Sequence, residues 1–183
     1  RLRAISSPEM AKEWSVPPPS HLAAGQENDE IREALLSFSA TPQPYITQVG
    51  DLLFSLPLVL EPFVDGPTLC GLAAELRSPS APTDASNDAL KWMMAVASRT
   101  VALLLAQVGQ ISTISEQGAK QLACDVSYLG NVFTAGLSLP QEEAVVELDS
   151  LLKCPTSDAA QVALQVKVLE RSLANAIAAK RSV

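Results

Sequence analysis

Apolar side chains recur every three or four residues through most of this chain, and polar side chains fill the positions between them. The clearest example lies within residues 44–63, where the apolar positions step by 3, 4, 3, 4 and 3 residues: Ile46, Val49, Leu53, Leu56, Leu60 and Phe63. This spacing places one continuous apolar stripe on a helix, whereas a strand would alternate at every second residue. We therefore predict a helix over this stretch.

Two prolines interrupt the stripe. Pro57 lies inside it and Pro62 closes it. A proline in a helix interior removes a backbone donor and crowds the preceding turn, at a cost of about 3 kcal/mol. We therefore expect the helix to be kinked or broken at Pro57, and we expect this break to set how the following helices turn onto the rest of the protein.

The same spacing predicts further helices along the chain. The expected segments are a short helix through Ile31, Leu35 and Leu36, another from Leu69 to Leu76, one capped by Asp88 with a stripe from Leu90 to Val108, one over residues 116–135 ended by Gly136 and Pro140, one starting at Pro140 with Val145, Leu148, Leu151 and Leu152 inward, and a last one capped by Ser157 or Asp158 that runs to Lys180 and Arg181.

Two segments lack this pattern. Residues 1–27 contain three consecutive prolines and few large apolar side chains, so we expect an extended leader or linker there, with Trp14 anchored locally on the domain. Residues 77–88 have the composition of a solvated loop, and this interpretation is favoured over phosphorylation of Ser78, Ser80 or Ser86. The expected organisation is a leader over 1–27 and a helical domain over 28–183.

Composition supports an all-α fold. Hydrophobic residues make up 48% of the chain but aromatic residues only 4%. The apolar content is mostly Ala, Leu and Val, and Ala and Leu lose little side-chain entropy in a helix. Helices with 3/4 spacing can pack with their axes nearly aligned while neighbouring helices run in opposite directions. We therefore predict a bundle of about six helices.

Charge and cysteine content exclude several classes of function. The net charge of −7 disfavours binding to phosphate backbones or docking to an anionic membrane by charge. Cys70, Cys124 and Cys154 are odd in number and far apart, which favours a reducing compartment over a disulfide framework.

No apolar stretch reaches the length of about 20 residues that a spanning helix needs. Because the chain has no initiator Met, we expect it to be a fragment or a processed piece.

Residues that could carry chemistry are few. His21 is the single histidine and lies in the proline-rich leader, and no Cys or His pair has metal-ligand spacing. Carboxylates gather at Glu142, Glu143, Glu147 and Asp149. Glu143 and Glu147, one turn apart, could form an acid/base pair or a metal site, but a solvated helix face is the favoured interpretation.

Other polar and sulfur-containing residues also have structural interpretations. Asp51, Glu61 and Asp125 flank apolar stripes, where single carboxylates usually cap or pair. Met93 and Met94 could form an adaptable binding surface, but beside Trp92 they are expected to be core residues. The sequence therefore predicts no catalytic, cofactor-binding or metal-binding residues, no cofactor and no enzyme.

Two blocks of sequence carry a family resemblance. The first is Pro44-Tyr45-Ile46-Thr47-Gln48-Val49-Gly50-Asp51, followed by Leu56-Pro57 and Leu60-Glu61-Pro62-Phe63. The second is Ala119-Lys120-Gln121-Leu122, Asp125-Val126, Tyr128-Leu129 and Asn131-Val132. Together they resemble the C-terminal region of subunit seven of the conserved oligomeric Golgi complex, over about residues 37–180.

This resemblance implies a non-catalytic subunit of a tethering complex built of helical-bundle rods. It implies peripheral association with the cytosolic face of the Golgi and a role in retrograde transport within the Golgi, which keeps glycosylation enzymes in place. The implied partners are the other subunits, with SNAREs, Rab GTPases and coiled-coil tethers bound through the assembly. Three alternatives stay open: a scaffold domain of another tethering or adaptor complex, a small helical hydrolase, and a helix lying on a membrane.

Overall fold

The computed structural model describes residues 2–15, 41–61 and 85–181, and among these residues there are helices and connecting segments but no β-strand. In chain order the elements are η1 (Leu2–Ser6), α1 (Pro8–Trp14), α3 (Pro44–Leu60), α5 (Ala85–Val108), α6 (Glu116–Asn131), η3 (Val132–Gly136), α7 (Glu143–Lys153), η4 (Thr156–Asp158), α8 (Ala159–Gln165) and α9 (Arg171–Arg181). The predicted all-α helical bundle is confirmed.

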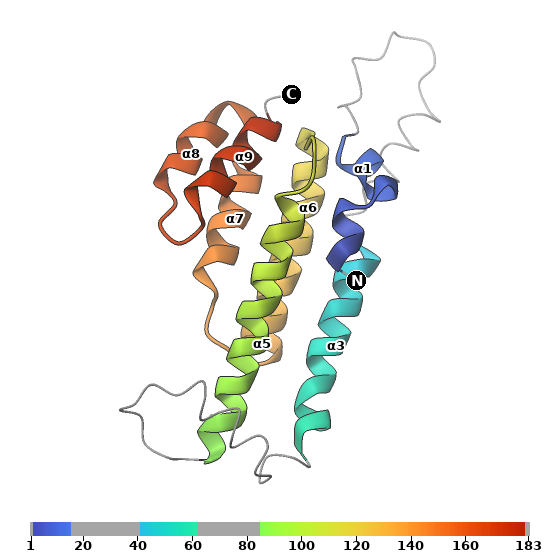
Figure 1. The fold of residues 1–183 in the computed structure, drawn as a ribbon, viewed down its shortest axis with the longest axis vertical. Helices are drawn as coiled ribbons and strands as arrows, with labels where there is room; N and C mark the ends of the chain where they lie inside the picture. Colours follow the sequence, from blue (N-terminus) through green and yellow to red (C-terminus); the bar gives the residue numbers. More distant parts are fainter. Residues whose placement is uncertain (1, 16–40, 62–84, 182–183) are drawn as a thin grey trace.

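Helices α3, α5, α6 and α7 run along the long axis of the molecule and alternate in direction (Figure 1). Helices α8 and α9 pack against each other beside the upper end of α7, and η1 and α1 lie near the start of α3 (Figure 1). Because α5 runs opposite to both α3 and α6, these two helices run in the same direction (Figure 1).

The predicted apolar stripes form the core. On α6 the whole stripe is at most 1% exposed, and on α7 the four expected positions are buried as well. Each large aliphatic or aromatic side chain buried in this way stabilises the folded state by about 1.5–3 kcal/mol relative to its exposure in water. The buried α6 stripe is Ala119, Leu122, Val126, Leu129 and Phe133.

The beginning of the chain differs from the expected extended leader. Residues 2–14 form η1 and α1, and the indole N–H of the buried Trp14 donates to the carbonyl of Ile5 at 2.8 Å. The carbonyl of Trp14 accepts a bond from the backbone N–H of Ser115 at 2.7 Å. Trp14 is thus anchored locally, as expected. The boundary predicted after residue 27 stays a prediction, because residues 16–40 lie outside the described part.

Helix α3 is not broken at Pro57, which corrects one of the two expected outcomes. The helix continues to Leu60, and the carbonyl of Pro57 accepts the backbone N–H of Glu61. Pro57 is exposed and lies in the last turn of α3, so its missing N–H and its ring affect the turn before it, and the helix continues for three residues beyond it. The helices expected at 31–36 and 69–76, and Phe63, lie outside the described residues.

Helix α5 begins at Ala85, upstream of Asp88, so Asp88 is not its N-cap and the loop predicted over 77–88 does not extend through residues 85–88. Short polar residues in a first helical turn are compatible with such a start. Of the two methionines, Met93 is buried as expected whereas Met94 is 40% exposed. The predicted stripe is therefore buried from Ala97 onward, but its first member, Leu90, is 44% exposed.

The connection between α6 and α7 is longer than predicted. The end of α6 widens into a π-helical turn over Val132–Gly136, and α7 begins at Glu143 rather than at Pro140. Leu139 is buried, and its N–H donates to the carbonyl of Phe133 at 2.9 Å. This bond and the burial of Leu139 hold the connecting segment against the core, and α7 therefore begins later in the sequence than predicted.

Candidate functional site

The two sequence blocks meet at a buried carboxylate. Asp125 on α6 is fully buried, and its Oδ1 accepts the backbone N–H of Gln43 at 2.8 Å. The hydroxyl of Tyr45 donates to Oδ2. The side-chain amide of Gln121 donates to Oδ1 at 3.2 Å and to the carbonyl of Thr41 at 3.1 Å. The expectation that Asp125 caps or pairs is confirmed, since it accepts a bond at the N-terminus of α3, where negative charge is favourable.

Farther along the same interface, Gly50 of the first block lies against Tyr128 of the second. A Cβ atom at Gly50 would lie 2.5 Å from the Tyr128 hydroxyl oxygen, so the two helices approach closely because Gly50 has no side chain. The family blocks thus contain residues that fit one another across the contact between α3 and α6. Sequence reasoning identified both blocks but could not place them together.

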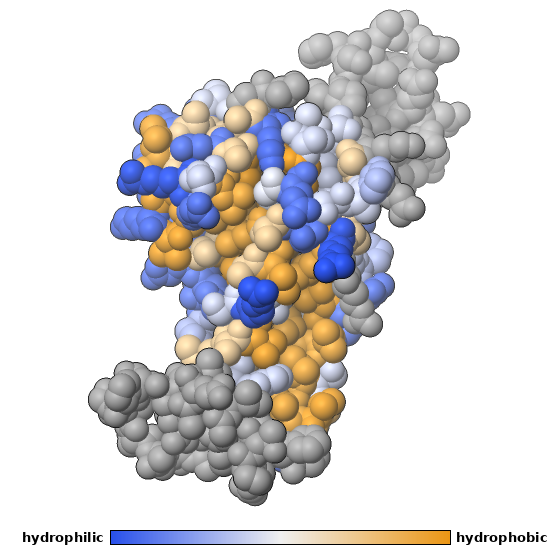
Figure 2. All heavy atoms as spheres, in the orientation of Figure 1, coloured by the Kyte–Doolittle hydropathy of each residue, from blue (hydrophilic) through white to orange (hydrophobic). Residues whose placement is uncertain are grey.

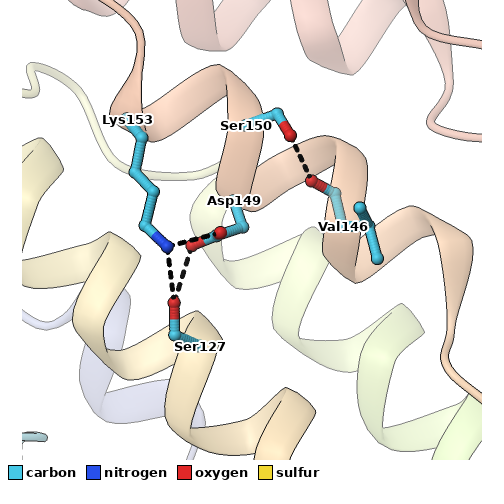
Figure 3. Close-up of polar contacts among 5 residues, drawn as sticks. All are labelled: Ser127, Val146, Asp149, Ser150 and Lys153. Atoms are coloured by element: carbon cyan, nitrogen blue, oxygen red, sulfur yellow. Dashed lines mark hydrogen bonds and ion pairs between the residues drawn. The ribbon is translucent and has the colours of Figure 1, made fainter.

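A polar cluster fastens α6 to α7 (Figure 3). The hydroxyl of Ser127 donates to Oδ1 of Asp149 at 2.8 Å, and Lys153 Nζ pairs with Oδ2 of Asp149 at 2.6 Å. Lys153 Nζ also donates to Ser127 Oγ at 3.0 Å. These three bonds join one side chain of α6 to two of α7. Asp149 has a structural role here.

Glu147 has a role that the sequence did not indicate. Its Oε1 accepts the backbone N–H of Lys167 at 2.8 Å, and its Oε2 accepts those of Val168 at 3.0 Å and Leu169 at 2.7 Å. Partial desolvation raises the pKa of this carboxyl, but the three N–H donors and the Lys167 charge favour the ionised form more strongly. The net effect holds the pKa of Glu147 below its usual range.

These bonds explain a further departure from prediction. The last helix, expected to run unbroken from Ser157 or Asp158 to its basic end, is divided into α8 and α9 by residues 166–170. In that segment Glu147 supplies the acceptor that intrahelical carbonyls would otherwise provide. Val166 and Leu169 are buried there, at 6% and 2% exposure. Glu147 therefore does not lie on a purely solvated helix face.

The other carboxylates singled out in the sequence do not gather around Glu147. Glu142 precedes α7 as its N-cap residue, and Glu143 is exposed in the first turn. Asp51 is exposed on α3, and Glu61 caps the C-terminus of that helix. Since Glu147 is engaged with backbone amides, Glu143 and Glu147 do not form the acid/base arrangement that was considered.

Sequence reasoning also missed what the basic end of α9 does. Arg181 is only 4% exposed, and its guanidinium donates to the carbonyls of Leu151 and, at 2.7 Å, Cys154. These acceptors lie at the C-terminus of α7, where a cation is favourable. Lys180 Nζ donates to the carbonyl of Gly109, and burial lowers the pKa of this amine. The Lys-Arg pair at the end of the predicted last helix was the available signal, but the sequence does not indicate which distant carbonyls it reaches.

Groups suited to metal or thiol chemistry do not gather in the described part of the chain. No cluster of three or more His, Cys, Asp or Glu side chains that could hold a metal ion occurs among residues 2–15, 41–61 and 85–181. Cys124 and Cys154 are both half-buried, and burial, with nearby Asp125, raises the pKa of the Cys124 thiol, which disfavours its thiolate. His21 and Cys70 lie outside the described residues. Within these residues, no helix combines the length and apolar character needed to cross a bilayer.

The fold and these contacts define a class of protein: a helical bundle whose buried polar groups connect helices to one another. The chain belongs to the family described as Golgi complex component 7, whose model matches residues 16–182. The match includes both blocks on which the resemblance rested, so the predicted family is confirmed.

Several full-length relatives are similar to the chain. It is 37% identical over 124 residues to conserved oligomeric Golgi complex subunit 7 of Arabidopsis thaliana, covering 68% of this chain and 14% of that protein. It is 36% identical over 163 residues to the subunit of the same name from Homo sapiens, covering 85% of this chain and 21% of that protein. The chain thus spans about a fifth or less of these relatives. No solved structure matches it.

Proposed function

We propose that this chain is a non-catalytic helical domain of a Golgi vesicle-tethering complex, which acts in retrograde transport within the Golgi and in the maintenance of glycosylation enzymes. One observation carries the proposal: the two family blocks form a single buried contact, centred on Asp125, in a bundle that matches the family model over residues 16–182. The domain's task is then to present helical surfaces to partners.

The proposed partners are the other subunits of the oligomeric Golgi complex. Through that assembly the domain contributes to the capture of vesicles, together with SNAREs, Rab GTPases and coiled-coil tethers, at the cytosolic face of the Golgi membrane. The proposal includes no cofactor. A non-catalytic role is supported by Glu147, Asp149 and Ser127, which are engaged in bonds that join separate segments of the bundle.

Co-expression of the tagged chain with the other subunits, followed by pull-down, tests this function. We expect at least one subunit to be captured by the folded chain, as verified by its helical circular dichroism. The matched control is the chain carrying Asp125→Ala, which disrupts the contact between the two blocks and should reduce capture together with stability. Failure of the folded wild-type chain to capture any subunit would contradict the proposal.

A further inference from the structure

An apolar groove of about 740 Å³ lies between α3 and α5. Its walls include Leu52, Leu53 and Leu56 on α3, Val96 and Leu103 on α5, and Leu2 of η1. Leu52 is 50% exposed and Leu103 is 43% exposed, so large aliphatic side chains face solvent there. Figure 2 shows hydrophobic surface gathered along the lower parts of these helices, with hydrophilic residues beside it. We call this surface the α3–α5 groove.

The chain itself shows what kind of segment fits between these helices. At the upper end of the groove, η1 contacts both α3 and α5 and places the fully buried Ile5 in the core. Ser6 Oγ lies 2.8 Å from Oε1 of Gln107 on α5, which fixes η1 at that end. From the end that η1 occupies, the α5 wall extends from Gln107 back to Val96, about 17 Å or three helical turns. A short helix with one apolar stripe matches this length.

Among the residues whose side chains the structure describes, the charges beside the α3–α5 groove are basic, although the chain as a whole is acidic. Arg3 lines the groove, and the exposed Arg99 lies three residues after Val96 and four before Leu103, next to their face of α5. Asp51, at about 100° per residue, lies on the side of α3 opposite the groove-lining residues. Glu61 follows the C-terminal end of α3, beyond Leu56.

We propose that the α3–α5 groove binds an amphipathic α-helix of a partner protein whose apolar stripe is flanked by Asp or Glu residues. The stripe covers Leu52, Leu56 and Leu103, and the acidic flanks pair with Arg3 and Arg99. This is the helix-in-groove mode of recognition, in which apolar anchors give affinity and flanking charges select the partner. The inference deepens the proposed function and rests on it, because it names the surface and the partner chemistry that an assembly role requires.

Two synthetic helical peptides of about 16 residues test the groove. Both carry leucines at helical spacing, but one has Glu and the other Lys at the flanking positions. Binding to the full 183-residue chain is measured by fluorescence anisotropy. We expect the Glu-flanked peptide to bind at least about tenfold more tightly, and Arg99→Glu to reduce or reverse this preference.

Matched variants separate the groove from general hydrophobic binding. Leu103→Glu and Leu52→Glu should weaken the Glu-flanked peptide by about tenfold or more, whereas Leu164→Glu, at a 65% exposed leucine on α8, should not. Circular dichroism establishes that each variant is folded. Equal binding of both peptides, no binding, equal effects of Leu103→Glu and Leu164→Glu, or self-association of the chain through Leu103 would overturn the inference.

The two proposals can fail separately. If the chain captures no Golgi-complex subunit but binds the Glu-flanked peptide through Leu103, the proposed function fails and the groove inference stands. If the chain captures subunits but binds neither peptide, only the groove inference is overturned.

Discussion

The hydroxyl of Tyr45 donates a hydrogen bond to the buried carboxylate of Asp125, which lies 80 residues away in the sequence. The bond joins the first turn of α3 to the middle of α6. Both residues belong to the blocks that identify the family, and the sequence alone does not explain why these residue types occur there. Their shared role in one buried contact offers that explanation.

Replacing Tyr45 with Phe should destabilise the protein by about 1–3 kcal/mol, because a buried carboxylate loses a donor while the aromatic ring is kept. Urea unfolding followed by circular dichroism measures the change. Ser55→Ala is the control, since its hydroxyl makes an exposed bond to the carbonyl of Leu52 on the same helix. Equal stabilities of Tyr45→Phe and wild type would show that the bond contributes nothing.

Replacing Gly118 with Ala should separate α1 from α6. A Cβ there would lie 2.4 Å from the carbonyl oxygen and 2.9 Å from the Cα of Trp14, and backbone atoms cannot move aside as a side-chain tip can. We expect a loss of about 1–3 kcal/mol and greater exposure of Trp14, visible as a red shift in its fluorescence.

Gly130→Ala is the matched control on the same helix. Its Cβ would meet only Val145 Cγ1, at an ordinary 3.6 Å, so better helix propensity should stabilise the protein by up to about 1 kcal/mol. If both glycine substitutions changed stability in the same direction, packing against Trp14 would not be the cause.

The contribution of Glu147 should depend on pH. Because its pKa is lower in the folded state than in the unfolded chain, its stabilisation is fully present above the usual glutamate pKa of about 4.3 and is lost as pH falls through the lower folded value. Glu147→Gln should therefore cost about 1–3 kcal/mol at pH 7 and progressively less below about pH 4.

Urea unfolding of wild type and Glu147→Gln across this range measures that difference. Glu143→Gln, at an exposed position on the same helix, controls for the loss of one negative charge. Amide hydrogen exchange should also accelerate at Lys167 and Leu169 in the Glu147 variant alone. A stability difference that does not change with pH would exclude the ionised carboxylate as the acceptor.

Replacing Arg181 with Met should destabilise the protein by about 2–4 kcal/mol, since the carbonyls of Leu151 and Cys154 lose their donors. Arg181→Lys should recover only part of this, because an ammonium group cannot reproduce the forked geometry. Thermal unfolding gives both values. Arg171→Met, at an exposed position on the same helix, should have little effect, and a similar loss there would point to charge alone.

The periodicity of the sequence determined which faces are buried. The stripes on α6 and α7 are in the core where they were expected, because the position of an apolar side chain around a helix depends only on the 3.6-residue repeat. The end of this helical run at Gly136 and the all-α class follow from equally local signals. The family blocks were also visible as sequence, and the family match supports them.

The tertiary structure alone decided how these helices are joined. The division between α8 and α9 depends on Glu147, about 20 residues earlier, and the packing of residues 2–14 depends on Ser115 and Gly118. The partners of Asp125 and Arg181 are likewise distant in the sequence. A local pattern encodes the direction in which a side chain points from its own helix. It does not encode which distant backbone or side-chain group that side chain contacts, because the contact forms only once the helices have packed.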